Sequence, residues 1–134
     1  MASVFTKIVR GELPSFKIFE DDFTLSFLSI APVGPGHTLV IPKEEIDSFV
    51  DVPPELYLRT MSHCRLIAPA IEKASGKKRV CLAVQGFEVP HFHVHLIPCD
   101  KPEDFDFSLA KSASFEEMEP MAHQIRAFLP TTPH

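Results

Sequence analysis

The segment VPHFHVHLIP, residues 89–98, carries a histidine at every second position. His91, His93 and His95 alternate with apolar residues that are mostly branched or aromatic, a pattern that favours a β-strand. Alternate side chains of a strand point to the same face of a sheet. The sequence therefore predicts three imidazoles in a row on one sheet face, and the rest of the chain has to build that sheet.

The 134-residue chain predicts one domain of class α+β over residues 1–134. Apolar alternation between turn-forming residues predicts four further strands, at 16–20, 24–30, 37–42 and 79–85. Helical spacing of apolar residues predicts four helical segments, within 3–14, near 44–50, at 55–74 and at 115–129. Pro69 is expected to kink the long helix or to end it early. Short links between most neighbouring strands predict an antiparallel sheet with helices packed on it.

Composition limits the classes of function. A net charge of −5 and a pI near 5.8 disfavour a general nucleic-acid-binding protein. The three cysteines are widely spaced and form no CxxC pair, which favours a reducing, cytoplasmic setting over a disulfide framework. No apolar run approaches the roughly 20 residues that cross a bilayer, and the N-terminus does not resemble a signal peptide. We therefore expect no nucleic-acid or membrane partner.

Three explanations compete for the histidine row. A polar strand face without chemistry is the simplest, but three histidines at alternate positions are improbable by chance. A metal site needs nitrogens that converge at about 2.0 Å on one point, whereas three same-face positions of a strand span roughly 13 Å, so a ligand such as His37 would have to come from elsewhere. Catalysis suits the spacing better, because imidazoles that titrate near neutrality can attack phosphorus and hydrogen-bond a row of phosphate oxygens.

The pattern His-φ-His-φ-His-φ-φ of residues 91–97, where φ is apolar, resembles the histidine-triad (HIT) family. The segments FTKIVRGELPSFKIFEDD, LSFLSIAPVGPGHTLVIPK and EVPHFHVHLIP are similar to segments of its Hint branch, in the same order, over about residues 3–98. The resemblance implies a five-stranded antiparallel sheet with one long helix and short terminal helices, and a homodimer whose sheets together form ten strands. Residues 99–134 match no family feature and are expected to be a C-terminal extension with a helix.

The resemblance also implies hydrolysis or transfer at the α-phosphate of nucleotides through a nucleotidyl-histidine intermediate. His93 would be the nucleophile, His95 would contact the phosphate and assist the leaving group, and His91 would orient the others. His37, in PGHTLVIP, corresponds to a fourth active-site histidine that approaches the phosphate. The residues implied in substrate binding are Val4, Phe5, Ile8, Phe27, Ser29, Ile30, Glu88 and Val89.

Several positions depart from the family pattern. Ser29 stands where Hint proteins usually carry an aspartate that holds the ribose. Glu88 stands at a Ser/Thr position ahead of the triad, where a carboxylate repels phosphate unless it is protonated or turned away. Zinc-binding members have two cysteines and a histidine where this chain has Ser3, Thr6 and Glu44–Glu45. We therefore expect no metal and no other cofactor.

The leading hypothesis is a metal-independent nucleoside phosphoramidase that acts on purine nucleotides and releases a nucleoside monophosphate. One alternative is a dinucleoside polyphosphate hydrolase of the Fhit branch, against which the Hint-like first helix argues. Another is a nucleotide-binding regulatory protein with little turnover, which Ser29 and Glu88 keep open. A metal-dependent hydrolase that uses the histidine row is the last.

Overall fold

The computed structural model describes residues 2–130, and residues 1 and 131–134 lie outside the described part. Its centre is a five-stranded antiparallel sheet with the order β1-β2-β3-β5-β4. The strands are β1 (Lys17–Glu20), β2 (Thr24–Leu28), β3 (Thr38–Pro42), β4 (Arg79–Ala83) and β5 (Val94–Cys99). The helices are α1 (Val4–Val9), α2 (Pro54–Ser75) and α3 (Phe115–Ala127), with short 3₁₀ turns η1 (Phe49–Asp51), η2 (Pro102–Asp104) and η3 (Phe107–Leu109). The predicted α+β class with an antiparallel sheet and one long helix is confirmed.

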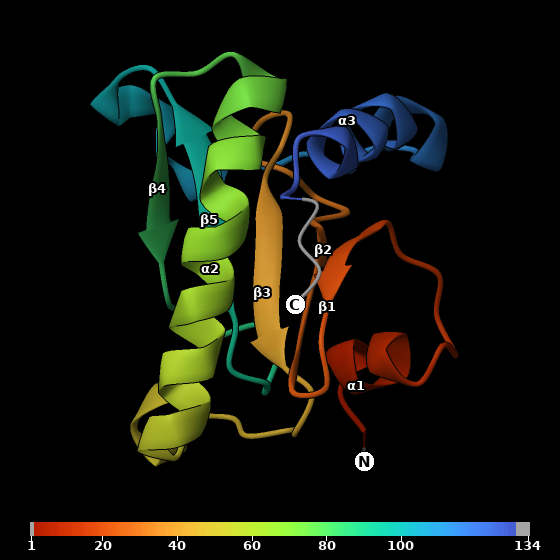
Figure 1. Ribbon diagram of the computed structural model, residues 1–134, viewed down its shortest axis with the longest axis vertical. Coiled ribbons are helices and arrows are strands. Elements are labelled where there is room, and N and C mark those ends of the chain that lie inside the picture. The colour runs from red at the N-terminus through yellow and green to blue at the C-terminus, as the bar shows by residue number, and fades with distance from the viewer. Residues whose placement is uncertain (1, 131–134) are drawn as a thin grey trace.

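The helices lie on opposite faces of this sheet because the strand residues alternate. Val40 and Val94 point into the main core, where α2 and α3 pack. Leu39 and Ile41, the neighbours of Val40, point to the other face and pack with Phe5 of α1. In Figure 1, α2 crosses in front of the sheet and α1 lies near the end of β1 and β2. The α1 face is the one on which the histidines gather.

The predicted elements differ from the observed ones mainly at their ends. The fifth strand begins at Val94 instead of His91, because its partner β3 ends at Pro42, close to where the register would place Phe92. The short helical piece near 44–50 is replaced by η1.

Pro69 was expected to kink the long helix or to end it early, and the early end is wrong, because α2 continues through Pro69 to Ser75. Pro69 lies on the exposed side of the helix, where water can bond the carbonyl group that loses its N–H partner. The buried residues Ile67, Ala70 and Ile71 hold both sides of this turn against the core. Tertiary packing therefore overrides the local preference of the proline.

The order of the strands could not be read from their order in the chain. β5 inserts between β3 and β4, which leaves β4 at one edge of the sheet. No helix among residues 2–130 combines the length and the apolar character that a membrane span needs.

Candidate active site

The three histidines of the row lie on the α1 face of the sheet, as the alternation predicts. The ring of Phe5 meets His91 and His93 edge-on, with centroids 5.9 Å and 5.0 Å apart. His93 in turn lies 4.9 Å from His95, again edge-on. His91 and His93 precede β5, so strand pairing does not hold them in the row. Tertiary hydrogen bonds hold His91, and a local bond to the His91 carbonyl holds His93.

His91 is fully buried and its tautomer follows from its partners. Its Nε2 lies 2.8 Å from the carbonyl oxygen of Pro42, which can only accept, so Nε2 carries the proton. Its Nδ1 is 2.9 Å from the hydroxyl of Ser3 and accepts from it. Burial lowers the pKa of His91, although the Pro42 carbonyl and the charge of Glu45 oppose that shift. His91 is therefore a neutral ring that is bonded at both nitrogens.

His93 presents an unprotonated nitrogen to the site. Its Nδ1 lies 2.6 Å from the backbone oxygen of His91, so Nδ1 is the protonated nitrogen and the lone pair is on Nε2. Burial is the main cause that lowers the pKa of His93, which keeps the ring neutral near pH 7. The side chain is 5% exposed, and its backbone partner leaves the nucleophilic nitrogen free. This is the state that a nitrogen nucleophile requires.

His95 presents a protonated nitrogen to the site, because His37 occupies its other nitrogen. The Nδ1 of His37 accepts from the backbone N–H of Val33 at 3.0 Å, so the neutral ring of His37 is protonated at Nε2. That nitrogen donates to Nδ1 of His95 at 2.9 Å, which leaves the proton of His95 on Nε2. Burial and the neighbouring histidines lower the pKa of His37 to about 3 and that of His95 to about 4. A bare nitrogen of His93 and an N–H of His95 therefore lie side by side.

The loop before β3 places His37. Gly36 adopts a positive φ of 94°, and a Cβ at this position would meet Cγ of Pro98 at 3.0 Å. Glycine is thus required directly before His37 on both conformational and steric grounds. The APVGPG loop turns the chain so that His37, directly before β3, lies beside His95 of the row.

The residues implied in substrate binding divide into a packed group and an exposed group. Phe5, Ile8 and Phe27 are buried together, with Val89 packed against them, and the two phenylalanine rings meet edge-on at 5.4 Å. The exposed positions are Val4 at 47%, Ile30 at 62% and Glu88. Ser29 is half-buried, and its hydroxyl accepts from the N–H of Ala31. The structure brings the first group to the histidine row and leaves Val4 and Ile30 facing outward.

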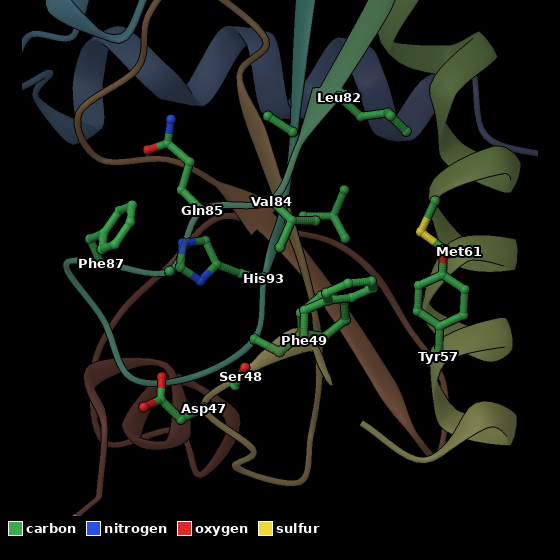
Figure 2. A pocket seen from close by; sticks show the side chains of 14 residues that line it. Asp47, Ser48, Phe49, Tyr57, Met61, Leu82, Val84, Gln85, Phe87 and His93 are labelled. Carbon is green, nitrogen blue, oxygen red and sulfur yellow. The ribbon is translucent and has the colours of Figure 1, made fainter. Parts of the chain in front are cut away.

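Two cavities border the histidines. One, of about 560 Å³, is lined by His93 and by apolar residues of α2, β4 and the loop after β4. Figure 2 shows Gln85, Phe87 and His93 on one side of it and Tyr57 and Met61 of α2 on the other. The second, of about 500 Å³, lies between His37 with Ser29 and the segment that leads into α3. Space for a ligand thus exists beside His93 and beside His37.

Several groups at this site were not identified as functional from the sequence. Phe107 of the C-terminal extension packs on His95, and the Pro42 carbonyl holds His91. Glu45 accepts hydrogen bonds from Ser3 and Thr6 next to His91. A backbone carbonyl has no sequence signature, and a lone phenylalanine or glutamate is too common to stand out. Ser3, Thr6 and Glu45 were noted in the sequence only because zinc-binding relatives carry metal ligands at these positions.

A metal ion would need several converging ligands. Among residues 2–130, no group of three or more His, Cys, Asp or Glu side chains is arranged to hold one. His91 is surrounded by hydroxyl and carbonyl oxygens, and His37 and His95 bond to each other. The expectation of a metal-independent site stays a prediction for experiment.

Comparison with known proteins gives the same picture. The family model of the HIT domain matches residues 10–102. A HIT-like protein of Borreliella burgdorferi is 37% identical over 84% of this chain and 86% of its own length. Adenylylsulfatase HINT3 of Arabidopsis thaliana is 39% identical, over 71% of this chain and 51% of that protein. Adenosine 5′-monophosphoramidase HNT1 of Saccharomyces cerevisiae is 36% identical, over 72% of this chain and 62% of that protein.

Solved structures agree over nearly the whole chain. A Hit-like protein from Bartonella henselae superposes with a TM-score of 0.83 and 31% identity, covering 93% of this chain and 95% of that one. A Zn-bound histidine triad protein from Mycobacterium smegmatis superposes with a TM-score of 0.80 and 30% identity, covering 95% of this chain and 92% of that one. These matches extend past residue 102, so the C-terminal extension is shared with structural neighbours.

Proposed function

This chain belongs to the histidine-triad (HIT) family, and from that premise we propose that it is a nucleotide hydrolase that acts through a nucleotidyl-histidine intermediate. The observation that carries the proposal is the pairing of a bare Nε2 on His93 with an N–H on the adjacent His95. A substrate phosphate placed over these two rings meets a nucleophile and a hydrogen-bond donor at once.

The proposed reaction has two steps. In the first, Nε2 of His93 attacks the α-phosphorus, the P–N bond to the leaving amine breaks, and the amine takes up a proton from solvent. The positive charge that develops on the His93 ring is stabilised by the His91 carbonyl, which accepts the Nδ1–H. The N–H of His95 stabilises the phosphate oxygens or the leaving atom. In the second step, water cleaves the bond between phosphorus and His93, releasing a nucleoside monophosphate and restoring the neutral imidazole.

We propose a purine nucleoside phosphoramidate as the substrate class. Relatives named as an adenosine 5′-monophosphoramidase and as an adenylylsulfatase support an adenosine-type substrate. Phe5 and Phe27 would bound the base, because the ring of Phe5 packs against His91 and His93 and the ring of Phe27 packs against Phe5. Ser29 would supply a neutral hydrogen bond toward the ribose, and Val89 and Glu88 would line the phosphate approach.

The test is turnover of an adenosine phosphoramidate by the purified protein, with and without EDTA. We expect EDTA to leave the rate unchanged, His93→Ala to abolish turnover, and mass spectrometry to find an adenylyl group on His93. Loss of activity in EDTA would instead indicate a metal-dependent hydrolase. Faster cleavage of a dinucleoside polyphosphate would indicate the Fhit-type reaction. Tight nucleotide binding without turnover would indicate a regulatory protein.

A homodimer belongs to the same proposal. β4 is an edge strand, and its side chain Leu82 is 50% exposed, while Val84 beyond its end is 43% exposed. Leu58 on the adjacent part of α2 is exposed as well. We propose that a second copy pairs along β4 and covers this apolar edge, which makes a ten-stranded sheet.

We further propose that residues 1–134 form a single HIT-like domain with a C-terminal extension, and that the protein acts in the cytoplasm. Coverage of more than nine-tenths of the chain by single solved chains supports one domain. Cys64, Cys81 and Cys99 are free thiols, as a reducing compartment would keep them.

A further inference from the structure

A cluster of three polar side chains lies directly behind His91. Both the backbone N–H of Ser3 and the hydroxyl of Thr6 donate to Oε1 of Glu45, at 2.7 Å and 2.6 Å. The hydroxyl of Ser3 lies 2.9 Å from Nδ1 of His91. We call Ser3, Thr6 and Glu45 the Glu45 cluster. It joins α1, the loop after β3 and the histidine row, which lie far apart in the sequence.

We propose that Glu45 is a positioning residue of the histidine row: its carboxylate anchors the start of α1, and through Ser3 it holds His91 in the tautomer and place that His93 requires. The inference rests on the proposed function, because it assigns Glu45 a role in the reaction of His93. Glu45 itself has no contact with His93 in this scheme.

The directions of the hydrogen bonds support this role. The hydroxyl of Thr6 donates its hydrogen bond to Glu45, and its oxygen lies 3.4 Å from Nδ1 of His91. The Ser3 hydroxyl, at 2.9 Å, is therefore the donor to that nitrogen. The Ser3 oxygen also accepts from the N–H of Thr6, which caps α1 and leaves the Ser3 proton for His91. Because the Nε2–H of His91 donates a hydrogen bond to the Pro42 carbonyl, Nδ1 of the neutral ring can only accept one. Each group in the cluster therefore has one consistent assignment.

The anchor matters because α1 is short. It contains six residues, and a helix of this length has little stability of its own. A carboxylate that accepts two hydrogen bonds at its start supplies a charge-assisted tertiary bond. Phe5, in the first turn of α1, contacts both His91 and His93. Displacement of α1 would therefore move the ring that packs against the nucleophile.

The backbone next to Glu45 holds the same segment from the other side. The carbonyl of Ile46 accepts from the N–H of Phe92 at 2.6 Å, between the two histidines. His91 then offers its own carbonyl to Nδ1 of His93 at 2.6 Å. Glu45 and Ile46 thus connect one loop to α1 by a side chain and to the histidine row by the backbone. A change at Glu45 can therefore reach His93 through a few hydrogen bonds and adjoining residues.

The test compares Glu45→Ala with Glu44→Ala, because both glutamates are exposed and only Glu44 lies outside the cluster. Ser3→Ala removes the donor to His91, and Ser3→Thr keeps a hydroxyl at the same place. Turnover of an adenosine phosphoramidate gives kcat and KM, and ¹⁵N NMR of the imidazoles gives the state of His91 Nδ1. All measurements are made well below the melting temperature of each variant, so that loss of folding does not enter.

We expect kcat to fall by roughly 10-fold in Glu45→Ala and Ser3→Ala, the lower end of the effect of removing outer-shell partners from an active-site histidine. Glu44→Ala should match the wild type, and Ser3→Thr should restore most of kcat. The His91 Nδ1 resonance should shift in both alanine variants. The double variant should lose little more than either single one, because both act on the same bond.

Two failures can be told apart. If Glu45→Ala keeps the wild-type kcat and leaves the His91 Nδ1 resonance in place, the positioning role is overturned while the proposed hydrolase stands. If the wild type forms no adduct and turns over no substrate, the proposed function fails. The NMR comparison of Glu45→Ala with Glu44→Ala then decides by itself whether Glu45 positions His91.

Discussion

Phe107 stands edge-on to His95, with ring centroids 4.8 Å apart and the planes at 77°. The same ring lies 6.3 Å from His37. Phe107 begins η3, within the extension for which the sequence indicated no role. The extension therefore covers part of the two histidines that bond to each other, His37 and His95. Burial is the main cause that lowers the pKa of His95 to about 4.

Replacing Phe107 by alanine should raise the pKa of His95 toward its ordinary value of 6.5, because water would then reach the ring. NMR titration of the histidine side chains measures this directly. Phe115→Ala, which removes a partly exposed ring on α3, is the control and should leave His95 unchanged. An unaltered titration of His95 in Phe107→Ala would show that the extension does not set its environment.

Turnover should persist below pH 6.5. Protonation removes the lone pair of His93, and burial lowers the pKa of this ring, so the loss of kcat/KM should begin on the acid side of the ordinary value. The charge of Glu88 opposes the shift, so Glu88→Gln should move the acid limb to still lower pH. A midpoint at or above 6.5 would contradict a neutral, buried nucleophile.

Removal of His37 should impair the donor rather than the nucleophile. Without its N–H, Nδ1 of His95 loses the bond that keeps the proton of His95 on Nε2. We expect kcat to fall by roughly 10-fold to 100-fold in His37→Ala, as for other partners that orient an active-site histidine. Single-turnover experiments should still detect the adduct on His93. Absence of that adduct would mean that His37 acts in the attack itself.

Stability should decline as the pH falls from 6.5 toward about 4, in part because of His63. This ring bonds Thr24 at 2.7 Å and Ser26 at 2.8 Å, and burial lowers its pKa to about 4. Between these pH values His63 is protonated in the unfolded chain and neutral in the folded protein. Acid therefore favours unfolding. His63→Ala should cost roughly 2–3 kcal/mol at neutral pH, because two buried hydroxyls lose a partner. Chemical denaturation across this pH range should also show a flatter profile for the variant.

An acidic residue on the edge strand should separate the proposed dimer. Leu82→Asp places a charge at a half-exposed position of β4, and light scattering after size exclusion should report a monomer. Leu13→Asp changes an exposed leucine in the turn after α1 and should leave the assembly intact. A monomeric wild type, or a dimer that survives Leu82→Asp, would exclude pairing along β4.

The local patterns of the sequence were sufficient for the elements and for the face of the histidine row. A period of two placed His93 and His95 on one side, and turn residues separated the strands of the α+β fold. The structure places the first helix within the predicted range 3–14 and caps it with Ser3. These properties depend on residues that are close in the chain, so a pattern of neighbours contains them. The ends of β5 and the course of α2 through Pro69 do not depend on neighbours in the chain alone. Strand pairing decides the first and core packing the second.

The working state of the site was decided only by the tertiary structure. His37 reaches His95 across 58 positions of the chain, and Ser3 reaches His91 across 88. These contacts, with the carbonyls of Pro42 and His91, determine which nitrogen of each imidazole carries the proton. The sequence by itself determined that three imidazoles would share a face. Folding decided that one of them offers a lone pair and its neighbour an N–H, because a tautomer is set by the partner that each nitrogen finds.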